Sequence, residues 1–213
     1  MIHPATSVRT VNPVVGDGVF ATEFIPKGTL VWVLCRFDRI IDRRLMSDWP
    51  ERVSKAADRF GYIDALGRLV VCWDHARMVN HCCDPTGIGV GNGFEIARRD
   101  IHPGDQLTCD YGLLNMTESL VCACGATACR GVIHAEGADR MEESWDAWAQ
   151  DAFAAALTVD QPLLPFVRAE IDEDRAIVEA LRRRTAIVLP STRAMLQVPV
   201  TVSSPSMRTG RMS

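Results

Sequence analysis

The sequence predicts a β-rich α+β fold of short strands in several small sheets, followed by a helical C-terminal extension. From about residue 8 to residue 111, short apolar and β-branched runs alternate with turn residues, which is the pattern of short strands. From about residue 139 to residue 184, apolar residues recur at helical spacing instead. The connections contain no repeated strand–helix–strand unit, so we do not expect a parallel doubly wound sheet.

Six short runs are the strand candidates. Pro26-Lys-Gly28 marks a tight turn between the first two, and Pro103-Gly104 ends a similar turn between the last two. The segment 64–67 predicts a hairpin loop between the middle two. In chain order, the predicted strands cover residues 18–22, 29–34, 62–63, 69–72, 94–97 and 106–109.

Three helical regions are expected. The first covers about residues 42–60, where Pro50 interrupts the helix or starts a new one. The second covers residues 141–157, in which Trp145 and Trp148 belong to an apolar stripe that we expect to pack on the β-rich body. Pro162 and Pro165 separate it from a third helix at about residues 167–184.

The composition is that of an ordinary globular protein. Of 213 residues, 47% are hydrophobic and 23% are charged, and the formal net charge is −4. A protein that coats nucleic acid would carry an excess of Lys and Arg, so direct nucleic-acid binding is not expected. The longest apolar runs fall far short of the roughly 18 to 20 residues of a membrane-spanning helix. The N-terminus lacks a secretory signal pattern, and we expect an intracellular, cytoplasmic location.

The eight cysteines divide into two groups. Cys35, Cys72 and Cys109 lie in or beside strand-like apolar stretches, so we expect them to be buried in the core. The other five lie in loop-like stretches: Cys82, Cys83, Cys122, Cys124 and Cys129.

The segment Cys122-Ala-Cys124-Gly-Ala-Thr-Ala-Cys129 has the spacing C-x-C-x4-C. Three thiolates leave a tetrahedral Zn²⁺ one ligand short, and the only other cysteine cluster is Cys82-Cys83. A site with four sulfur ligands would be structural, because no position remains for water. Buried or disulfide-bonded cysteines, and a redox-sensing Cys82-Cys83 pair, are the alternatives.

Two further motifs flank these cysteines. The first, Gly16-Asp-Gly18, is a weak signal by itself, and it is not a dinucleotide fingerprint because the third glycine and the following helix are missing. The second, Asp110-Tyr111-Gly112, taken singly, is compatible with a strand end that buries an aromatic ring.

Taken in order, the blocks resemble the SET-domain protein lysine methyltransferases that carry a post-SET zinc knuckle. Asn80-His81-Cys82-Cys83-x-Pro corresponds to N-H-S-C-x-P in that family, and residues 97–112 correspond to A-x-R-D-I-x-x-G-E-E-L-T-F-D-Y-G. The resemblance covers about residues 8–132. It implies a SET fold with a pseudo-knot at residues 1–115, a post-SET zinc knuckle at 116–133, a helical extension at 134–200 and a flexible tail at 201–213.

The resemblance also implies that the protein binds S-adenosylmethionine and a structural zinc ion. Cys83 would join the three C-terminal cysteines, so that the zinc ligands would be Cys83, Cys122, Cys124 and Cys129. Cys82 would then be free. Seven residues would form the cofactor site: Val15, Gly16, Asp17, Gly18, Tyr62, Asn80 and His81.

Tyr111 would be the catalytic tyrosine for methyl transfer to a lysine amine of a protein substrate. A lysine side chain has a pKa of about 10.4, so exposing its neutral amine at pH 7 costs about 4.6 kcal/mol. A narrow apolar channel lowers that cost by disfavouring the ammonium form. The phenol oxygen of Tyr111 would orient the amine lone pair for attack on the methyl group. The structural alternative is that Tyr111 only packs.

The chain departs from the family pattern at three positions. Met78 replaces Phe before the N-H block, Thr86 replaces the Asn that closes it, and Cys109 replaces a Phe or Tyr that influences how many methyl groups are added. Because a thiol is smaller than an aromatic ring, we predict that multiple methylation is tolerated.

Two other functions compete with the enzyme. One is a non-catalytic, SET-like interaction protein that keeps the zinc, and the other is a zinc-knuckle nucleic-acid binder, which would need interleaved basic and aromatic residues that the cysteine segment lacks. The expected partner is a lysine-containing protein or peptide, and the net charge of −4 suits a basic one. No membrane partner is expected.

Overall fold

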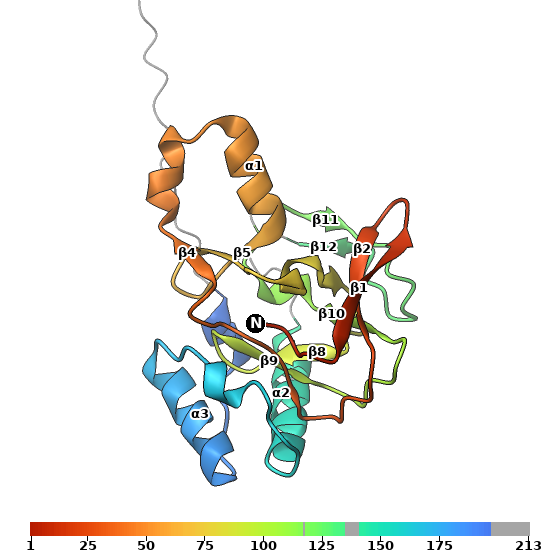
Figure 1. Ribbon diagram of the computed structural model, residues 1–213, viewed down its shortest axis with the longest axis vertical. Helices are drawn as coiled ribbons and strands as arrows, with labels where there is room; N and C mark the ends of the chain where they lie inside the picture. Colours follow the sequence, from red (N-terminus) through yellow and green to blue (C-terminus); the bar gives the residue numbers. More distant parts are fainter. Residues whose placement is uncertain (117, 135–140, 197–213) are drawn as a thin grey trace, which may run out of the picture.

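The computed structural model describes residues 1–116, 118–134 and 141–196 (Figure 1). The tail expected at residues 201–213 lies outside the described residues. The strands are β1 Thr6–Asn12, β2 Gly16–Ala21, β3 Leu30–Val33, β4 Arg39–Ile41, β5 Gly61–Ile63, β6 Leu69–Val71, β7 Asn80–His81, β8 Gly87–Gly89, β9 Phe94–Ala97, β10 Gln106–Cys109, β11 Leu120–Val121 and β12 Val132–Ile133. The α-helices are α1 Glu51–Phe60, α2 Glu142–Ala156 and α3 Asp172–Arg183. Short 3-10 helices include η1 Arg43–Asp48, η2 His75–Met78, η3 Tyr111–Leu113, η5 Leu164–Phe166 and η6 Thr192–Met195.

The strands form several small sheets, as the sequence predicts. Within the described residues the strand orders are β1-β2-β10-β7, β3-β9-β8, β4-β6-β5 and β11-β12. All pairs are antiparallel except β7 with β10, which run parallel. The hairpin expected around residues 64–67 is confirmed as the β5–β6 pair.

Two strand–turn–strand units pair with each other. The first unit is β2, the following turn and β3, and the second unit is β9, the following turn and β10. Each unit's two strands pair with the other unit and not with each other: β2 with β10, and β3 with β9. In the two turns, Ile25 and Ile101 exchange backbone hydrogen bonds of 2.9 Å. Gly28 and Gly104 adopt φ angles of +89° and +94°, and each donates its amide to the last residue of the other unit's leading strand. A positive φ favours glycine because it has no Cβ. The turns therefore belong to one structural motif that occurs twice.

The helices lie at opposite ends of the molecule. Figure 1 shows α1 at one end and α2 with α3 at the other. The helical region expected at 42–60 is divided at Pro50 into η1 and α1, and no residue of α1 is buried. The third helix begins at Asp172, later than predicted, after η5 and an extended segment. None of the described helices is long and apolar enough to cross a membrane.

The expected packing of the tryptophan stripe is confirmed. α2 contacts β8 and β9, and Trp145 is completely buried in the core that these elements share with α3. Trp148 is partly buried against the same core. The C-terminal helices therefore complete the hydrophobic core of the β-rich body and do not form a separate layer.

Candidate functional site

Strand β7 brings two of the predicted site residues to the end of β10. Asn80 pairs with Thr108 and His81 pairs with Cys109, in parallel register. The Asn80 side-chain amide donates a 3.0 Å hydrogen bond to the Asp17 carbonyl, which fixes β2 beside this pair. The predicted G-x-G segment and the Asn80-His81 pair therefore lie together, although more than sixty residues separate them in the chain.

Close packing explains one glycine of the G-x-G segment. A Cβ on Gly18 would lie 2.7 Å from the Gln106 side-chain nitrogen and 2.9 Å from that of Asn80. At Gly16, which has a φ of +83°, a Cβ would meet nothing within 4 Å. One side of the segment is therefore packed, and the other is open.

Tyr111 lies at the start of η3, directly after β10, and two hydrogen bonds orient it. Its hydroxyl donates to the Val79 carbonyl at 2.8 Å, and its amide donates to His81 Nδ1 at 3.1 Å. The His81 and Tyr111 ring centroids are 5.4 Å apart. Burial raises the pKa of Tyr111 well above its usual range, so the phenol is neutral at physiological pH. Because its proton points at Val79, the oxygen keeps lone pairs that can accept another hydrogen bond.

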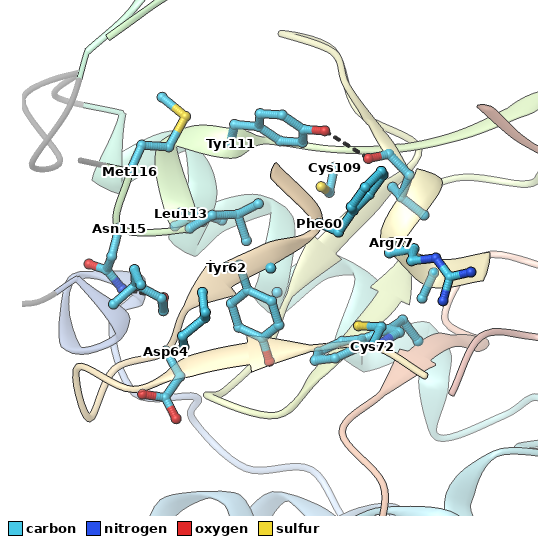
Figure 2. Close-up of a pocket in the computed structure, with 18 of the residues that line it drawn as sticks. Phe60, Tyr62, Asp64, Cys72, Arg77, Cys109, Tyr111, Leu113, Asn115 and Met116 are labelled. Carbon is cyan, nitrogen blue, oxygen red and sulfur yellow. Dashed lines mark hydrogen bonds between the residues drawn. The ribbon is translucent and has the colours of Figure 1, made fainter. Parts of the chain in front are cut away.

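A cavity of about 570 Å³ lies beside Tyr111. Figure 2 shows Tyr111 on one side, Tyr62 on the opposite side, and Cys109 between them, with Phe60 and Leu113 along the walls. Burial raises the pKa values of both Tyr62 and Cys109, so these two groups are neutral. Together with Phe60 and Leu113 they form an apolar wall beside the phenol of Tyr111, and charged side chains line other parts of the cavity.

Tyr62 lies apart from the other predicted cofactor residues. It lines the cavity of Tyr111 and packs edge-on against Trp32, with ring centroids 5.6 Å apart. None of Val15, Gly16, Asp17, Gly18, Asn80 and His81 lines that cavity.

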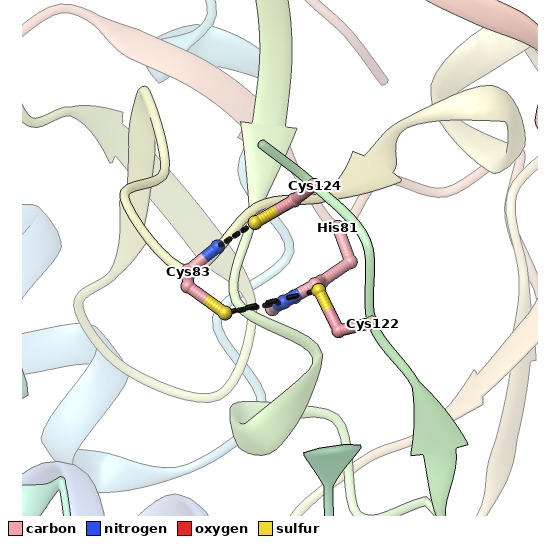
Figure 3. A group of neighbouring side chains, drawn as sticks. All are labelled: His81, Cys83, Cys122 and Cys124. Atoms are coloured by element: carbon pink, nitrogen blue, oxygen red, sulfur yellow. Dashed lines mark hydrogen bonds between the residues drawn. The ribbon is translucent and has the colours of Figure 1, made fainter. Parts of the chain in front are cut away.

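The sulfur cluster, defined as Cys83, Cys122, Cys124 and Cys129, joins the loop after β7 to the segment between β11 and β12. The Cys122 sulfur lies 3.8 Å from that of Cys83 and 3.7 Å from that of Cys129. The Cys83 amide donates to the Cys124 sulfur at 3.5 Å, and Cys124 interacts with both Cys122 and Cys129. The four predicted cysteines are therefore brought together. Figure 3 shows three of them, Cys83, Cys122 and Cys124, with His81.

His81 borders the sulfur cluster. Its Nε2 lies 3.3 Å from the Cys83 sulfur, and one ligand atom each from His81, Cys83, Cys122 and Cys124 lie within 4.8 Å of one another. All eight cysteines are free thiols. Cys35, Cys72 and Cys109 are buried, as predicted.

Asp110 connects the segment of Tyr111 to the segment of the sulfur cluster. Its carboxylate is buried and accepts hydrogen bonds from the Gly112 amide at 3.0 Å, from Arg130 at 2.5 Å and from the Trp145 indole at 2.9 Å. The sequence pointed to Asp110 only as part of the D-Y-G motif and gave no signal for Arg130 beyond its place after Cys129. A buried carboxylate is stable when such donors surround it.

Known proteins that are similar to this chain are named as histone-lysine methyltransferases. The family model for the SET domain matches residues 16–112. A histone-lysine N-methyltransferase of Dictyostelium discoideum is 36% identical over 129 residues, which are 55% of this chain and 8% of that protein. An H3 lysine-4 specific histone-lysine N-methyltransferase of Eremothecium gossypii is 42% identical over 69 residues, which are 28% of this chain and 7% of that protein.

The chain thus spans less than a tenth of the length of these two relatives. Among solved structures, the methyltransferase domain of human histone-lysine N-methyltransferase SETMAR is similar, with a TM-score of 0.42 and 19% identity, covering 63% of this chain and 59% of that one. The segment that the SET family model matches, residues 16–112, contains the G-x-G segment, the Asn80-His81 pair and Tyr111. Residues 16–112 of this chain thus match the family model of the SET domain.

Proposed function

We propose that this chain transfers the methyl group of S-adenosylmethionine to a lysine side-chain amine of a protein substrate. The observation that carries the proposal is the position of the Tyr111 hydroxyl. It borders the apolar wall of the cavity and is held by Val79, directly before the Asn80-His81 pair that lies against the G-x-G segment. The SET domain and its similarity to histone-lysine methyltransferases support the same activity.

Six residues are proposed to hold the cofactor: Val15, Gly16, Asp17, Gly18, Asn80 and His81. The open side of Gly16 fits this role, because a ligand can approach the backbone there without meeting side chains. When bound, S-adenosylmethionine supplies a methyl group on a positively charged sulfur. Tyr62 is assigned to the substrate side instead, since it lines the cavity with Tyr111.

In this proposal, Tyr111 positions the amine and does not remove its proton. Its own proton is engaged by the Val79 carbonyl, and burial keeps the phenol neutral. A lone pair of the phenol oxygen accepts an N–H bond of the amine, which leaves the nitrogen lone pair directed along the cavity. The apolar walls disfavour the ammonium form of the lysine.

A structural zinc ion is proposed for the sulfur cluster. In a tetrahedral site with Zn–S bonds of about 2.3 Å, neighbouring sulfurs lie about 3.8 Å apart. The two sulfur–sulfur distances from Cys122, 3.8 and 3.7 Å, match this edge length. Residues 116–133 are accordingly proposed to form the post-SET zinc knuckle, and four thiolates leave no position for a reacting water.

The tautomer of His81 favours Cys129 as the fourth ligand. His81 Nδ1 accepts the Tyr111 amide, so in the neutral ring Nε2 carries the proton. A protonated Nε2 donates to the Cys83 sulfur and does not bind a metal ion. The Arg130 amide also donates to this sulfur, at 3.3 Å, as expected for a thiolate ligand with supporting donors.

Methyl transfer from labelled cofactor to lysate proteins tests the proposed function, with Tyr111→Phe as the matched variant. We expect the variant to transfer about 10²-fold more slowly while still binding S-adenosylmethionine in calorimetry, because the alignment of the amine is lost and the cofactor residues remain. Equal labelling by both proteins contradicts the role of Tyr111. Absence of cofactor binding by the wild type favours the non-catalytic interaction protein.

Metal content tests the zinc assignment independently of activity. We expect one zinc per chain in the wild type and in Cys82→Ser, and loss of zinc in Cys129→Ser. Cys82 interacts with Cys124 but is not one of the four proposed ligands, and Cys129 is. Retention of zinc by Cys129→Ser together with its loss in His81→Gln would replace Cys129 by His81 as the fourth ligand.

The number of methyl groups is tested by mass spectrometry of an exhaustively methylated peptide. Cys109 lines the cavity beside Tyr111, and its small thiol leaves room near the amine. We expect products beyond the monomethyl form, and fewer of them with Cys109→Phe. A monomethyl product alone from the wild type contradicts the assignment.

A further inference from the structure

The cavity beside Tyr111 contains one acidic side chain that the proposed mechanism does not use. Glu95 lies in the middle of β9, where it pairs with Trp32 on one side and Gly89 on the other. It lines the same cavity as Tyr62, Cys109 and Tyr111, and its charge acts on the pKa values of all three. Glu95 therefore lies close to the position that the target amine would occupy.

The Glu95 carboxyl has no partner among the described residues. No hydrogen bond or ion pair to it occurs in the part of the chain that the structure describes. Burial alone raises its pKa to about 7. The hydroxyl of Tyr62, in the same cavity, is also buried without a partner among the described residues. A buried polar group without a partner costs about 1 to 3 kcal/mol, so the Tyr62 hydroxyl points to a ligand that reaches it. The half-buried Glu95 carboxyl in the same cavity is open to that ligand.

The groups that face Glu95 indicate the charge of that ligand. Tyr62 from β5, Cys72 after β6, Cys109 from β10 and Tyr111 from η3 are all neutral at pH 7, because burial raises each pKa. The cations that line the cavity are exposed side chains of α1 and η2, namely Lys55, Arg59 and Arg77, and its other acids are Asp58, Asp64 and Glu118. Asp64 is paired with Arg68 at 2.6 Å. A carboxylate whose neighbours in the inner part of the cavity are these four neutral groups is suited to a cation.

We propose that Glu95 receives the ammonium group of the target lysine and accepts its proton, with the Tyr62 hydroxyl as a second polar contact. This rests on the proposed methyl transfer. In the step, one N–H bond of the ammonium breaks and its electron pair stays on nitrogen as the attacking lone pair. An O–H bond forms on the Glu95 carboxylate, and the proton later leaves to water through the mouth of the cavity. In the buried inner part of the pocket, a neutral amine beside a neutral acid is favoured over the ion pair, because both charges lose hydration.

The pH profile of methyl transfer to a lysine peptide tests the proton-accepting role. For the wild type, kcat should rise as the pH rises through about 7, where Glu95 becomes ionised. For Glu95→Gln, kcat at pH 7 should fall about 10²-fold, and the rate should recover towards pH 10, where the free amine is abundant. Glu95→Asp should restore part of the rate. Glu143→Gln removes an exposed glutamate of α2 and should leave the profile unchanged.

Binding of n-butylammonium, followed by the shift in thermal unfolding midpoint, tests the cation site without any turnover. We expect a shift for the wild type and for Glu143→Gln, a smaller one for Tyr62→Phe, and none for Glu95→Gln. If the wild type transfers no methyl group but the butylammonium shift depends on Glu95, the proposed function fails and the cation site stands. If Glu95→Gln keeps both the wild-type pH profile and the butylammonium shift, the inference about Glu95 is wrong although the enzyme works.

Discussion

The two strand–turn–strand units share a backbone but differ in what covers them. In the first unit, a Cβ on Gly28 would lie 2.4 Å from the Ala156 backbone nitrogen, because the end of α2 packs on this turn. In the second unit, a Cβ on Gly104 would meet nothing within 4 Å. The units also differ in their leading strands, β2 and β9, each of which ends in an alanine. Two residues before that alanine, β2 has the fully buried Val19, whereas β9 has Glu95. One unit has become a docking surface for a helix, and the other carries the strand that leads into Tyr111.

The largest difference is expected between Gly28→Ala and Gly104→Ala. Both place a Cβ at a positive φ, which costs about 1 kcal/mol or more. Gly28→Ala also forces the turn away from α2, so we expect it to lower the free energy of unfolding by about 4 kcal/mol in total. Denaturant titration of both variants measures this. Equal losses would show that α2 does not depend on contact with the first turn.

The second difference is electrostatic and concerns Glu95. Its pKa in the folded protein, about 7, is above that of an unfolded glutamate, so the folded state holds its proton more tightly. The free energy of unfolding should therefore fall as the pH rises from about 4.5 to about 7, by about 2 to 3 kcal/mol, and level off above. Glu95→Gln should remove this contribution in pH-dependent denaturation and leave that of Asp174, whose pKa burial raises to about 6. An unchanged slope in that variant would mean that Glu95 is ionised and solvated in the folded protein.

A smaller effect is expected at Gln161, which attaches the first unit to the segment after α2. Its side-chain oxygen accepts from the Leu30 amide at 2.8 Å, and its nitrogen donates to the Gly28 carbonyl at 2.8 Å. Gln161→Ala leaves these groups without partners, so we expect a loss of about 2 kcal/mol in the free energy of unfolding. Gln150→Ala is the matched control, because its contacts lie on the exposed side of α2. The attachment through Gln161 is unimportant if the control costs as much.

The smallest effect is expected for the ion pair that borders the first turn. Lys27 lies 2.6 Å from Asp151, and the Asp151 side chain is 67% exposed. Exposed pairs contribute less than about 1 kcal/mol, so Lys27→Met should change the unfolding midpoint only slightly and less at high salt. A loss comparable to that of Gln161→Ala would show that charge, and not the amide contacts, holds α2 on this turn.

Local sequence patterns were sufficient for part of this molecule. Tyr111 and the cysteines belong to short motifs whose chemistry depends on spacing, and the six predicted strands all occur, because an apolar run between turn residues defines a strand locally. The other described strands were missed: β1, β4, β7, β8, β11 and β12. Of these, β1 is largely exposed, and β7 spans two polar residues held by pairing with β10.

Contacts between residues far apart in the sequence could not be predicted from local patterns. The exchange of partners between the two units depends on pairs such as Ile25 with Ile101, and no local signal encodes it. The position of Tyr62 opposite Tyr111 has the same cause. In the sequence, Glu95 looks like an ordinary polar residue of a half-exposed strand, and only the cavity in the folded protein reveals it as an acid without a partner among the described residues.

The hydrogen bond between Trp145 and Asp110 has a practical consequence for anyone who wishes to shorten this protein. A fragment that stops after the last cysteine would keep every motif residue, yet it would remove the indole from one oxygen of a buried carboxylate and expose the faces of β8 and β9 that α2 covers. The smallest autonomous unit therefore extends beyond the boundary that homology alone would choose, and it includes the helix that carries Trp145.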